Sequence, residues 1–287
     1  MRNALTIDLE SVSHRYMAEE RHRSGTGRRV RTEISGKSSD RGEVLQTTRE
    51  ILNALREHDH RITFFIVGEI YDWYPDLVRE IRELGHEIAY HTHSHTRIDD
   101  ASTLASELRK SSEFITTFKT MGFRAPRASI TLECLSELAK HGFVYDSSSY
   151  GSLSWYAETA RIIEVPISTY SLLRNVRTSL PRPLSLKLLM DFEVPFGSGY
   201  FISLFSLASP ATLGYFINKL NRKGISSVLC LHPWQLCRKQ MKPFSNAVLP
   251  RLLMLPYDRS CFHAFAYLLR NYKLCTMSEL IENTGLL

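Results

Sequence analysis

The sequence predicts an α/β fold in which about eight parallel strands form a barrel, closed or partly open. Three observations predict it. Short apolar runs alternate with amphipathic helical stretches along the chain, glycines follow most of the helical stretches, and the 287 residues show no internal repeat and no linker. Because strand–helix alternation is typical of parallel βαβ units, we expect one domain over residues 1–287.

The predicted strands are short runs of β-branched, aromatic and aliphatic residues. They cover 4–7, 62–67, 86–90, 123–125, 143–145, 162–167, 227–231 and 274–276. Amphipathic spacing predicts helices over 42–57, 75–84, 104–121, 131–141 and 211–223. Gly85, Gly122, Gly142 and Gly224 follow four of these stretches, as expected for residues that end a helix.

Two regions break the alternation and are predicted to be a basic insertion, 12–41, and an irregular segment, 170–207. The formal charge of the chain is +6, but 12–41 and 174–187 each carry a net charge of +4, so the rest is slightly acidic. This local distribution excludes a generally basic, nucleic-acid-binding fold. Each basic segment is either a solvated loop or a clamp for a phosphate group or an anionic membrane surface.

The composition, with 43% apolar and 23% charged residues, is that of an ordinary globular protein and excludes a disordered or collagen-like chain. The five cysteines are odd in number and form no CxxC pair, so neither a disulfide framework nor a cysteine-type zinc site is indicated. The first residues, MRNALTIDLES, lack the apolar run of a signal peptide, and no stretch of ~20 apolar residues is present to cross a membrane. We therefore expect a cytoplasmic protein.

Polar side chains follow the predicted strands at the point where each strand ends. They are Asp8 and Glu10, His91, His93 and His95, Arg124 and Pro126, Asp146, and His232 with Trp234. Because the carboxyl ends of parallel strands in a barrel meet on one face, we expect these residues to build one site.

The spacing of His91 and His95 suggests a metal site. They are four residues apart in YHTHSH, so one helical turn would place both imidazoles on the same side, with His93 pointing elsewhere. Two neutral imidazoles and one carboxylate are a common ligand set for a hydrolytic Zn²⁺. The alternative is a polar, histidine-rich turn that binds no metal.

The acidic residues and His232 suggest hydrolysis. Asp8 and Glu10 could divide the tasks of taking a proton from water and holding the metal, or they could be a helix cap and a surface glutamate. His232 could protonate a leaving group, or be a core histidine. Arg124 could hold Asp8 ionised while Asp146 orients Arg124, or both could belong to structural ion pairs.

Five segments, in order, resemble the polysaccharide deacetylase superfamily, also called carbohydrate esterase family four, in its allantoinase-like and peptidoglycan-deacetylase-like branch. The segments are LTIDLES, the stretch from ITFFIVGEI to GHEIAYHTHSH, FRAPRASIT, GFVYDSSSY and LCLHPWQL. The resemblance covers nearly the whole chain and implies a distorted (β/α) barrel of seven to eight parallel strands.

The resemblance also implies roles for individual residues. The catalytic positions are matched by Asp8 as base, by His232 as acid, and by Arg124 and Asp146 as residues that tune them. The metal ligands are matched by Glu10, His91 and His95. The substrate contacts are matched by Trp234, Pro126 and Tyr200, with Trp234 near the acetyl pocket. The implied cofactor is a divalent metal, Zn²⁺ first, with Co²⁺, Ni²⁺ or Fe²⁺ as alternatives. Two departures concern Ser11, where related sequences often have a further acid, and Ile202, where they have an arginine.

We therefore expect a metal-dependent hydrolase that removes an N-acetyl or other N-acyl group from an amino-sugar-containing substrate, lipid- or nucleotide-linked. The alternatives are a deformylase or amidohydrolase for a non-polysaccharide substrate, and a catalytically inactive carbohydrate-binding relative. The expected partners are an N-acetylated saccharide or glycolipid and an anionic membrane at the inner, cytoplasmic face, contacted peripherally, but no nucleic acid. Apolar LSLKLLM and YFISLFSL are either part of such a surface or part of the core.

Overall fold

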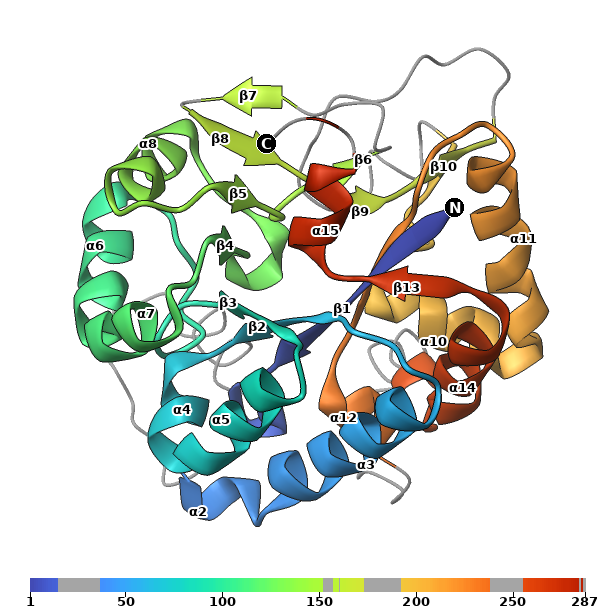
Figure 1. The fold of residues 1–287 in the computed structure, drawn as a ribbon, viewed down its shortest axis with the longest axis horizontal. Coiled ribbons are helices and arrows are strands. Elements are labelled where there is room, and N and C mark those ends of the chain that lie inside the picture. Colours follow the sequence, from blue (N-terminus) through green and yellow to red (C-terminus); the bar gives the residue numbers. More distant parts are fainter. Residues whose placement is uncertain are drawn as a thin grey trace.

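Helices surround a curled, largely parallel sheet in the computed structural model (Figure 1). The structure describes residues 1–14, 37–151, 157–159, 161–172, 192–237, 255–283 and 285. Most of the basic insertion and all of 174–187 lie outside these residues, so the expectations for those segments stay predictions.

The main sheet has the strand order β12-β1-β2-β3-β4-β5-β8-β7, with β13 beside the beginning of β1. These strands are β1 (Arg2–Leu9), β2 (Thr63–Ile66), β3 (Glu87–Tyr90), β4 (Gly122–Phe123), β5 (Tyr145–Asp146), β7 (Ala157–Thr159), β8 (Ile162–Glu164), β12 (Val228–Leu231) and β13 (Lys273–Cys275). All neighbours pair in parallel except β7, which is antiparallel to β8. Seven parallel strands, β12 to β8, thus form a curled half-barrel, which confirms the predicted fold class.

Two small sheets complete the strands of the described chain. They are formed by β6 (Tyr150–Gly151) with β9 (Ile167–Ser168) and by β10 (Tyr170–Ser171) with β11 (Glu193–Val194). The helices are α2 (Lys37–Asp40), α3 (Glu43–Glu57), α4 (Gly68–Trp73), α5 (Pro75–Glu83), α6 (Ala101–Lys110), α7 (Ser112–Phe118), α8 (Leu132–Lys140), α10 (Gly199–Ala208), α11 (Pro210–Asn221), α12 (Pro233–Leu236), α14 (Phe262–Asn271) and α15 (Met277–Glu282), with 3-10 helices η1 (Pro126–Ala128) and η2 (Leu255–Tyr257).

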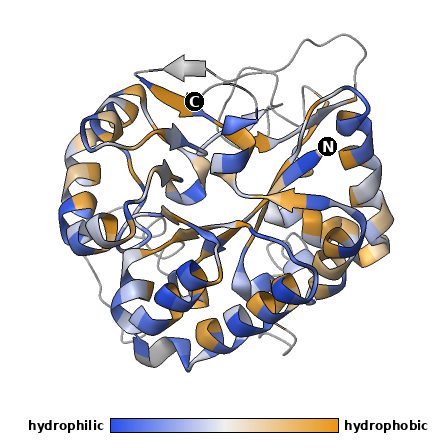
Figure 2. Cartoon of the chain, viewed as in Figure 1, coloured by the Kyte–Doolittle hydropathy of each residue, from blue (hydrophilic) through white to orange (hydrophobic). Residues whose placement is uncertain are grey.

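Strict alternation along β1 divides the core into two parts. Leu5, Ile7 and Leu9 belong to the large apolar cluster between the sheet and the outer helices, whereas Ala4 belongs to a second cluster with Phe65. Because successive side chains of a strand point to opposite faces, Thr6 and Asp8 share the face of Ala4. The outer helices α3 and α5 carry both hydrophilic and hydrophobic colours in Figure 2, as expected for helices with one buried face.

The second cluster is the interior of the half-barrel, and α15 covers it. Met277, Leu280 and Ile281 pack with the inward side chains of the strands, and α15 lies across the centre of the ring of strands in Figure 1. Thr276 and Glu279 form a capping box that fixes the start of this helix. Apolar packing therefore fills one end of the interior, and polar side chains occupy the other.

The structure corrects the sequence-based helices in two places. The stretch 104–121 is interrupted at Ser111, so that α6 and α7 replace one long helix. The segment 170–207 is not irregular throughout, because it contains the β10–β11 pair and most of α10. α10 escaped prediction because its sequence, GYFISLFSLA, is nearly uniformly apolar and shows no amphipathic spacing. Among the described residues, no helix is long and apolar enough to cross a bilayer.

Candidate active site

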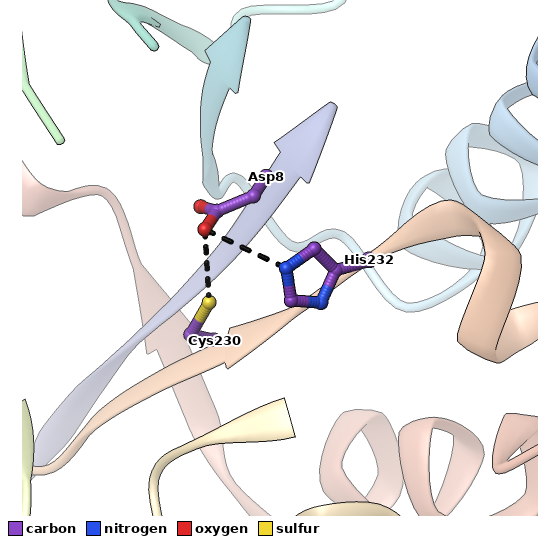
Figure 3. A group of neighbouring side chains, drawn as sticks. All are labelled: Asp8, Cys230 and His232. Carbon is purple, nitrogen blue, oxygen red and sulfur yellow. Dashed lines mark hydrogen bonds and ion pairs between the residues drawn. The ribbon is translucent and has the colours of Figure 1, made fainter. Parts of the chain in front are cut away.

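Asp8 lies on the inward face of β1, near the strand's carboxyl end, and is 4% exposed. Its Oδ1 accepts a hydrogen bond from Arg124 Nη1 at 2.6 Å. Its Oδ2 accepts a hydrogen bond from the thiol of Cys230, with Sγ at 3.3 Å, and lies 3.8 Å from His232 Nε2 (Figure 3). The two oxygens of one carboxylate thus face different groups.

Arg124 is the largest fully buried side chain of the described residues, and its guanidinium is held on every side. Besides Asp8, it donates to Thr6 Oγ1, to the carbonyl oxygen of Ser147 and to Ser147 Oγ, and it lies over the ring of Phe65 at 4.1 Å. Such a fork of donors holds a carboxylate in one position, and the positive charge of the arginine favours the ionised form of that carboxylate.

The electrostatics of Asp8 follow from these contacts. Burial by itself would raise the pKa of Asp8, but Arg124, His91 and His232 outweigh this effect, so the pKa lies below its ordinary value. Asp8 is therefore ionised at neutral pH, and Arg124 both orients it and keeps its charge. Burial raises the pKa of the Cys230 thiol well above the ordinary range, so Cys230 remains a donor to Asp8.

Glu10 follows two residues after Asp8, just beyond β1, and is 3% exposed. Trp234 Nε1 donates to Glu10 Oε1 at 3.0 Å, and His95 Nε2 lies 2.6 Å from Glu10 Oε2. Burial would raise the pKa of Glu10, but His95, His232 and His91 lower it well below its ordinary value. A second ionised carboxylate therefore lies beside the first.

His91 and His95 come together, but not through a helix. Their ring centroids are 5.1 Å apart, although residues 91–99 form no helical turn, so that expectation was wrong. Thr92 and His95 instead adopt left-handed backbone conformations, with φ of 60° and 51°, and the bent chain returns His95 to the cluster. Such strained residues are frequent at functional sites.

The donor atoms of Glu10, His91 and His95 fit a divalent cation. One donor atom from each lies within 4.8 Å of the others. The His91 ring nitrogen Nδ1 lies 2.7 Å from the carbonyl oxygen of Arg124, to which it must donate, so Nε2 keeps its lone pair. Burial lowers the pKa of His91 to about 4, so the ring is neutral at pH 7.

A further observation supports this fit. Glu10 Oε2 is buried and lies 2.6 Å from His95 Nε2, but it forms no hydrogen bond of good geometry with any described residue. A carboxylate oxygen and an imidazole nitrogen this close together become a suitable pair of cation ligands when the nitrogen carries no proton. His93 points away, as predicted: its Nδ1 lies 3.1 Å from Ser111 Oγ.

His232 lies just after β12, where it follows the inward-facing residues Val228 and Cys230 at intervals of two. Its Nδ1 lies 2.6 Å from Gln235 Oε1, and Gln235 Nε2 in turn donates to Gly199 O and Ser203 Oγ. Because an amide oxygen only accepts, Nδ1 carries the proton and Nε2 faces Asp8 and Glu10.

Aromatic rings extend from His232 along one side of the site. His232 stacks on Trp234 with centroids 4.8 Å apart, Trp234 meets Tyr257 edge-on at 5.1 Å, and Tyr257 meets Tyr200 at 5.5 Å. Tyr200, a predicted substrate contact, is thus linked to the site through Tyr257, which the sequence had not indicated. A small hollow beside Trp234 and Glu10 is also lined by Val44 and Pro233.

Asp146 does not take the place predicted for it. Its neighbour Tyr145 fills the barrel interior, so strand alternation turns Asp146 to the other face, beside Glu164 in the register of β5 and β8. Within the described residues no hydrogen bond joins Asp146 to Arg124; Ser147 holds the guanidinium instead. Asp146 acts indirectly, because it accepts from Ser148, whose Oγ accepts from the backbone N–H that follows Arg124. Burial and the neighbouring Asp146 carboxylate raise the pKa of Glu164 well above its ordinary value.

The remaining positions that the sequence indicated are all buried. Pro126 begins η1, two residues after Arg124, and is buried. Ser11 accepts hydrogen bonds from Ser13, and Ile202 lies fully buried in the outer core, so neither replaces the acid or the arginine of related sequences.

A buried arginine–carboxylate pair thus lies beside a carboxylate–imidazole cluster at the carboxyl ends of the strands of a (β/α) half-barrel, the face on which barrel folds build their active sites. Comparisons with known proteins add to this description. The family model described as polysaccharide deacetylase matches residues 38–145. This match covers 108 of the 287 residues, and it includes His91, His95 and Arg124.

Three relatives show the extent of the likeness. A peptidoglycan-N-acetylglucosamine deacetylase of Bacillus cereus is 39% identical over 59 residues, 21% of this chain and 22% of that protein. A protein of Bacillus subtilis assigned by name to the polysaccharide deacetylases is 24% identical over 196 residues, 65% of this chain and 63% of its own length. Both matches span less than two thirds of the relative. A polysaccharide deacetylase-like crystal structure from Mycobacterium smegmatis shares the fold, with a TM-score of 0.57 and 20% identity over 99% of this chain and 90% of that one.

Proposed function

We propose that the chain is a metal-dependent hydrolase that removes an N-acetyl group from an amino-sugar-containing substrate. One observation carries the proposal: an ionised Asp8 held by Arg124, the Glu10–His91–His95 cluster and His232 converge in one buried place. The match of residues 38–145 to the polysaccharide deacetylase model and the names of the relatives support the substrate class.

The residues divide the work as follows. A divalent cation bound by Glu10, His91 and His95 would act as a Lewis acid and lower the pKa of a nearby water molecule. Asp8 takes the proton from the attacking water through Oδ2, because Oδ1 is engaged by Arg124. In its doubly protonated form, His232 delivers the proton of Nε2 to the departing amine and keeps the Nδ1 proton that faces Gln235.

Substrate binding falls to the aromatic side of the site. Tyr200, linked to Trp234 through Tyr257, is the partly exposed ring of this row and is the one that we assign to contact with a sugar. The finer proposals, a lipid- or nucleotide-linked sugar and contact with an anionic membrane from the cytoplasmic side, rest on the basic segments 12–41 and 174–187. Sedimentation with anionic vesicles tests the membrane contact.

The test of the activity is a substrate panel. Full-length protein with Zn²⁺ is incubated with N-acetylglucosamine oligomers, a nucleotide-linked N-acetylglucosamine and an N-formylated amino sugar, and released acetate or formate is measured. We expect acetate release, and a loss in kcat of roughly 10²–10⁴-fold in Asp8→Asn.

The matched control is His93→Ala, which removes a neighbouring imidazole that faces Ser111 rather than the cluster. It should keep near-wild-type activity. Equal activity of the wild type and Asp8→Asn would refute the assignment of the base, and release of formate alone would favour the deformylase alternative.

A further inference from the structure

A second set of metal-ligating side chains lies beside the proposed cation site and shares no residue with it. Asp8, Cys230 and His232 come from the adjacent strands β1 and β12, and one donor atom from each lies within 4.8 Å of the others. Asp8 and Cys230 are each 4% exposed, and the side chain of His232 is 19% exposed. Figure 3 shows the three side chains pointing toward one another.

Hydrogen bonds elsewhere leave one free donor atom on each ligand. Arg124 engages Asp8 Oδ1, so Oδ2 faces the cluster. Gln235 Oε1 accepts the Nδ1 proton of His232, so the Nε2 lone pair faces the cluster as well. Cys230 Sγ lies 3.3 Å from Oδ2, and Nε2 lies 3.8 Å from the same oxygen.

These separations approach those between ligands of one tetrahedral cation. Bonds of 2.0–2.3 Å at tetrahedral angles place sulfur, nitrogen and oxygen ligands roughly 3.3–3.6 Å apart. A thiolate with an imidazole and a carboxylate selects a thiophilic metal such as Zn²⁺ over Mg²⁺ or Ca²⁺. A deprotonated Cys230 would add a negative charge for a divalent cation beside Asp8, whose own charge is shared with Arg124.

We propose that Asp8, Cys230 and His232 form a second, thiolate-containing site for a divalent cation, and that its occupancy inhibits the enzyme. Binding breaks the S–H bond of Cys230, forms a sulfur–metal bond and releases the thiol proton to solvent. The same cation occupies Asp8 Oδ2 and His232 Nε2, so neither can transfer a proton. The inhibition rests on the proposed function, whereas the binding does not.

The test is a titration of the metal-free full chain with Co²⁺, followed by absorption spectroscopy and by equilibrium dialysis. A sulfur–cobalt bond produces a charge-transfer band in the near ultraviolet that imidazole and carboxylate ligands do not produce. We expect two bound equivalents and this band in the wild type. Cys230→Ser should lose the band and one equivalent, whereas the matched control Cys237→Ser should keep both.

A third variant separates this site from the first one. His95→Ala should lose one equivalent but keep the band, because His95 belongs only to the Glu10 cluster. In the activity assay, a second equivalent of Zn²⁺ should inhibit the wild type at least tenfold and leave the residual activity of Cys230→Ser unchanged. Circular dichroism confirms folding, and Cys230→Ala replaces the serine variant if that variant does not fold.

The outcomes distinguish the two proposals. A wild type without the charge-transfer band, or a Cys230→Ser protein that keeps it, overturns the second site even if acetate is released. A wild type that shows the band but releases no acetate retains the second site and contradicts the proposed function.

Discussion

Replacement of Arg124 tests whether its buried guanidinium group holds the site together. Arg124→Met removes four hydrogen bonds and leaves the charge of Asp8 without its arginine partner. Removing one partner of a buried ion pair costs roughly 3–5 kcal/mol, and each abandoned buried acceptor about 1–3 kcal/mol. We therefore expect the free energy of unfolding at pH 7 to fall by roughly 5 kcal/mol. Arg124→Lys keeps the charge but not the fork, so its loss should be about half as large.

The loss of stability in Arg124→Met should depend on pH, and the direction of that dependence follows from the pKa of Asp8. In the wild type the pKa of Asp8 lies below its ordinary value, so its stabilising contribution is present above the unfolded pKa and is lost as the pH falls through the folded one. Without Arg124, burial dominates and the pKa of Asp8 rises. Asp8 is then protonated at mildly acidic pH and needs no partner, so the difference between Arg124→Met and the wild type should shrink between pH 7 and pH 4.5.

Urea unfolding followed by far-ultraviolet circular dichroism at both pH values provides the measurement. Arg79→Met is the control, because Arg79 pairs with Asp76 at the surface, where such a pair contributes about 0–1 kcal/mol. If Arg124→Met stays within about 1 kcal/mol of the wild type at pH 7, or if its deficit is the same at both pH values, Arg124 does not hold Asp8 as described.

Three further predictions concern metal retention, acid stability and packing. His95→Ala should retain less Zn²⁺ than His93→Ala after dialysis against a weak chelator, and equal retention would remove His95 from the ligand set. Burial lowers the pKa of His86 to about 4. Between about pH 4 and 6.5 the folded state therefore binds fewer protons than the unfolded chain. The free energy of unfolding should fall by up to roughly 3 kcal/mol as the pH drops through that window. His86→Asn should flatten this slope in urea unfolding; an unchanged slope would assign it to other groups. A methyl group on Gly122 would collide with the ring of Tyr145, so Gly122→Ala should lower the melting temperature by an amount equivalent to about 1–3 kcal/mol, and an unchanged melting temperature would show that the ring can move aside.

The sequence predicted the site well where strand alternation controls it. Asp8 and Glu10 lie two residues apart at the end of an apolar run, and the same interval relates Cys230 to His232. Applied to 227–231, that alternation would have identified Cys230, which had only been counted among unpaired cysteines. The fold class followed from the order of strands and helices, which depends on apolar patterning along the chain.

Prediction from the sequence failed where local backbone geometry or tertiary contacts determine which side chains meet. The interval of four between His91 and His95 suggested a helical turn, whereas left-handed residues bring the rings together. Asp146 was assigned to Arg124 because it follows a strand, but the one-residue difference between Tyr145 and Asp146 selects the opposite face. Periodicity also cannot show contacts such as that of Gln235 with His232, which depend on how a short helix begins.

The pairing of β1 has a consequence for biosynthesis. Residues 4–7 pair with Val228–Leu231, and residues 2–4 with Lys273–Cys275. A ribosome makes Asp8 well before Cys230 and His232, which follow it by more than 200 residues. Because such distant pairing forms slowly, the carboxylate remains without these two neighbours while the intervening residues are translated. The nascent chain therefore cannot complete the Asp8–Cys230–His232 cluster until β12 and His232 have been synthesised, whereas the residues of the Glu10–His91–His95 cluster are all available much earlier.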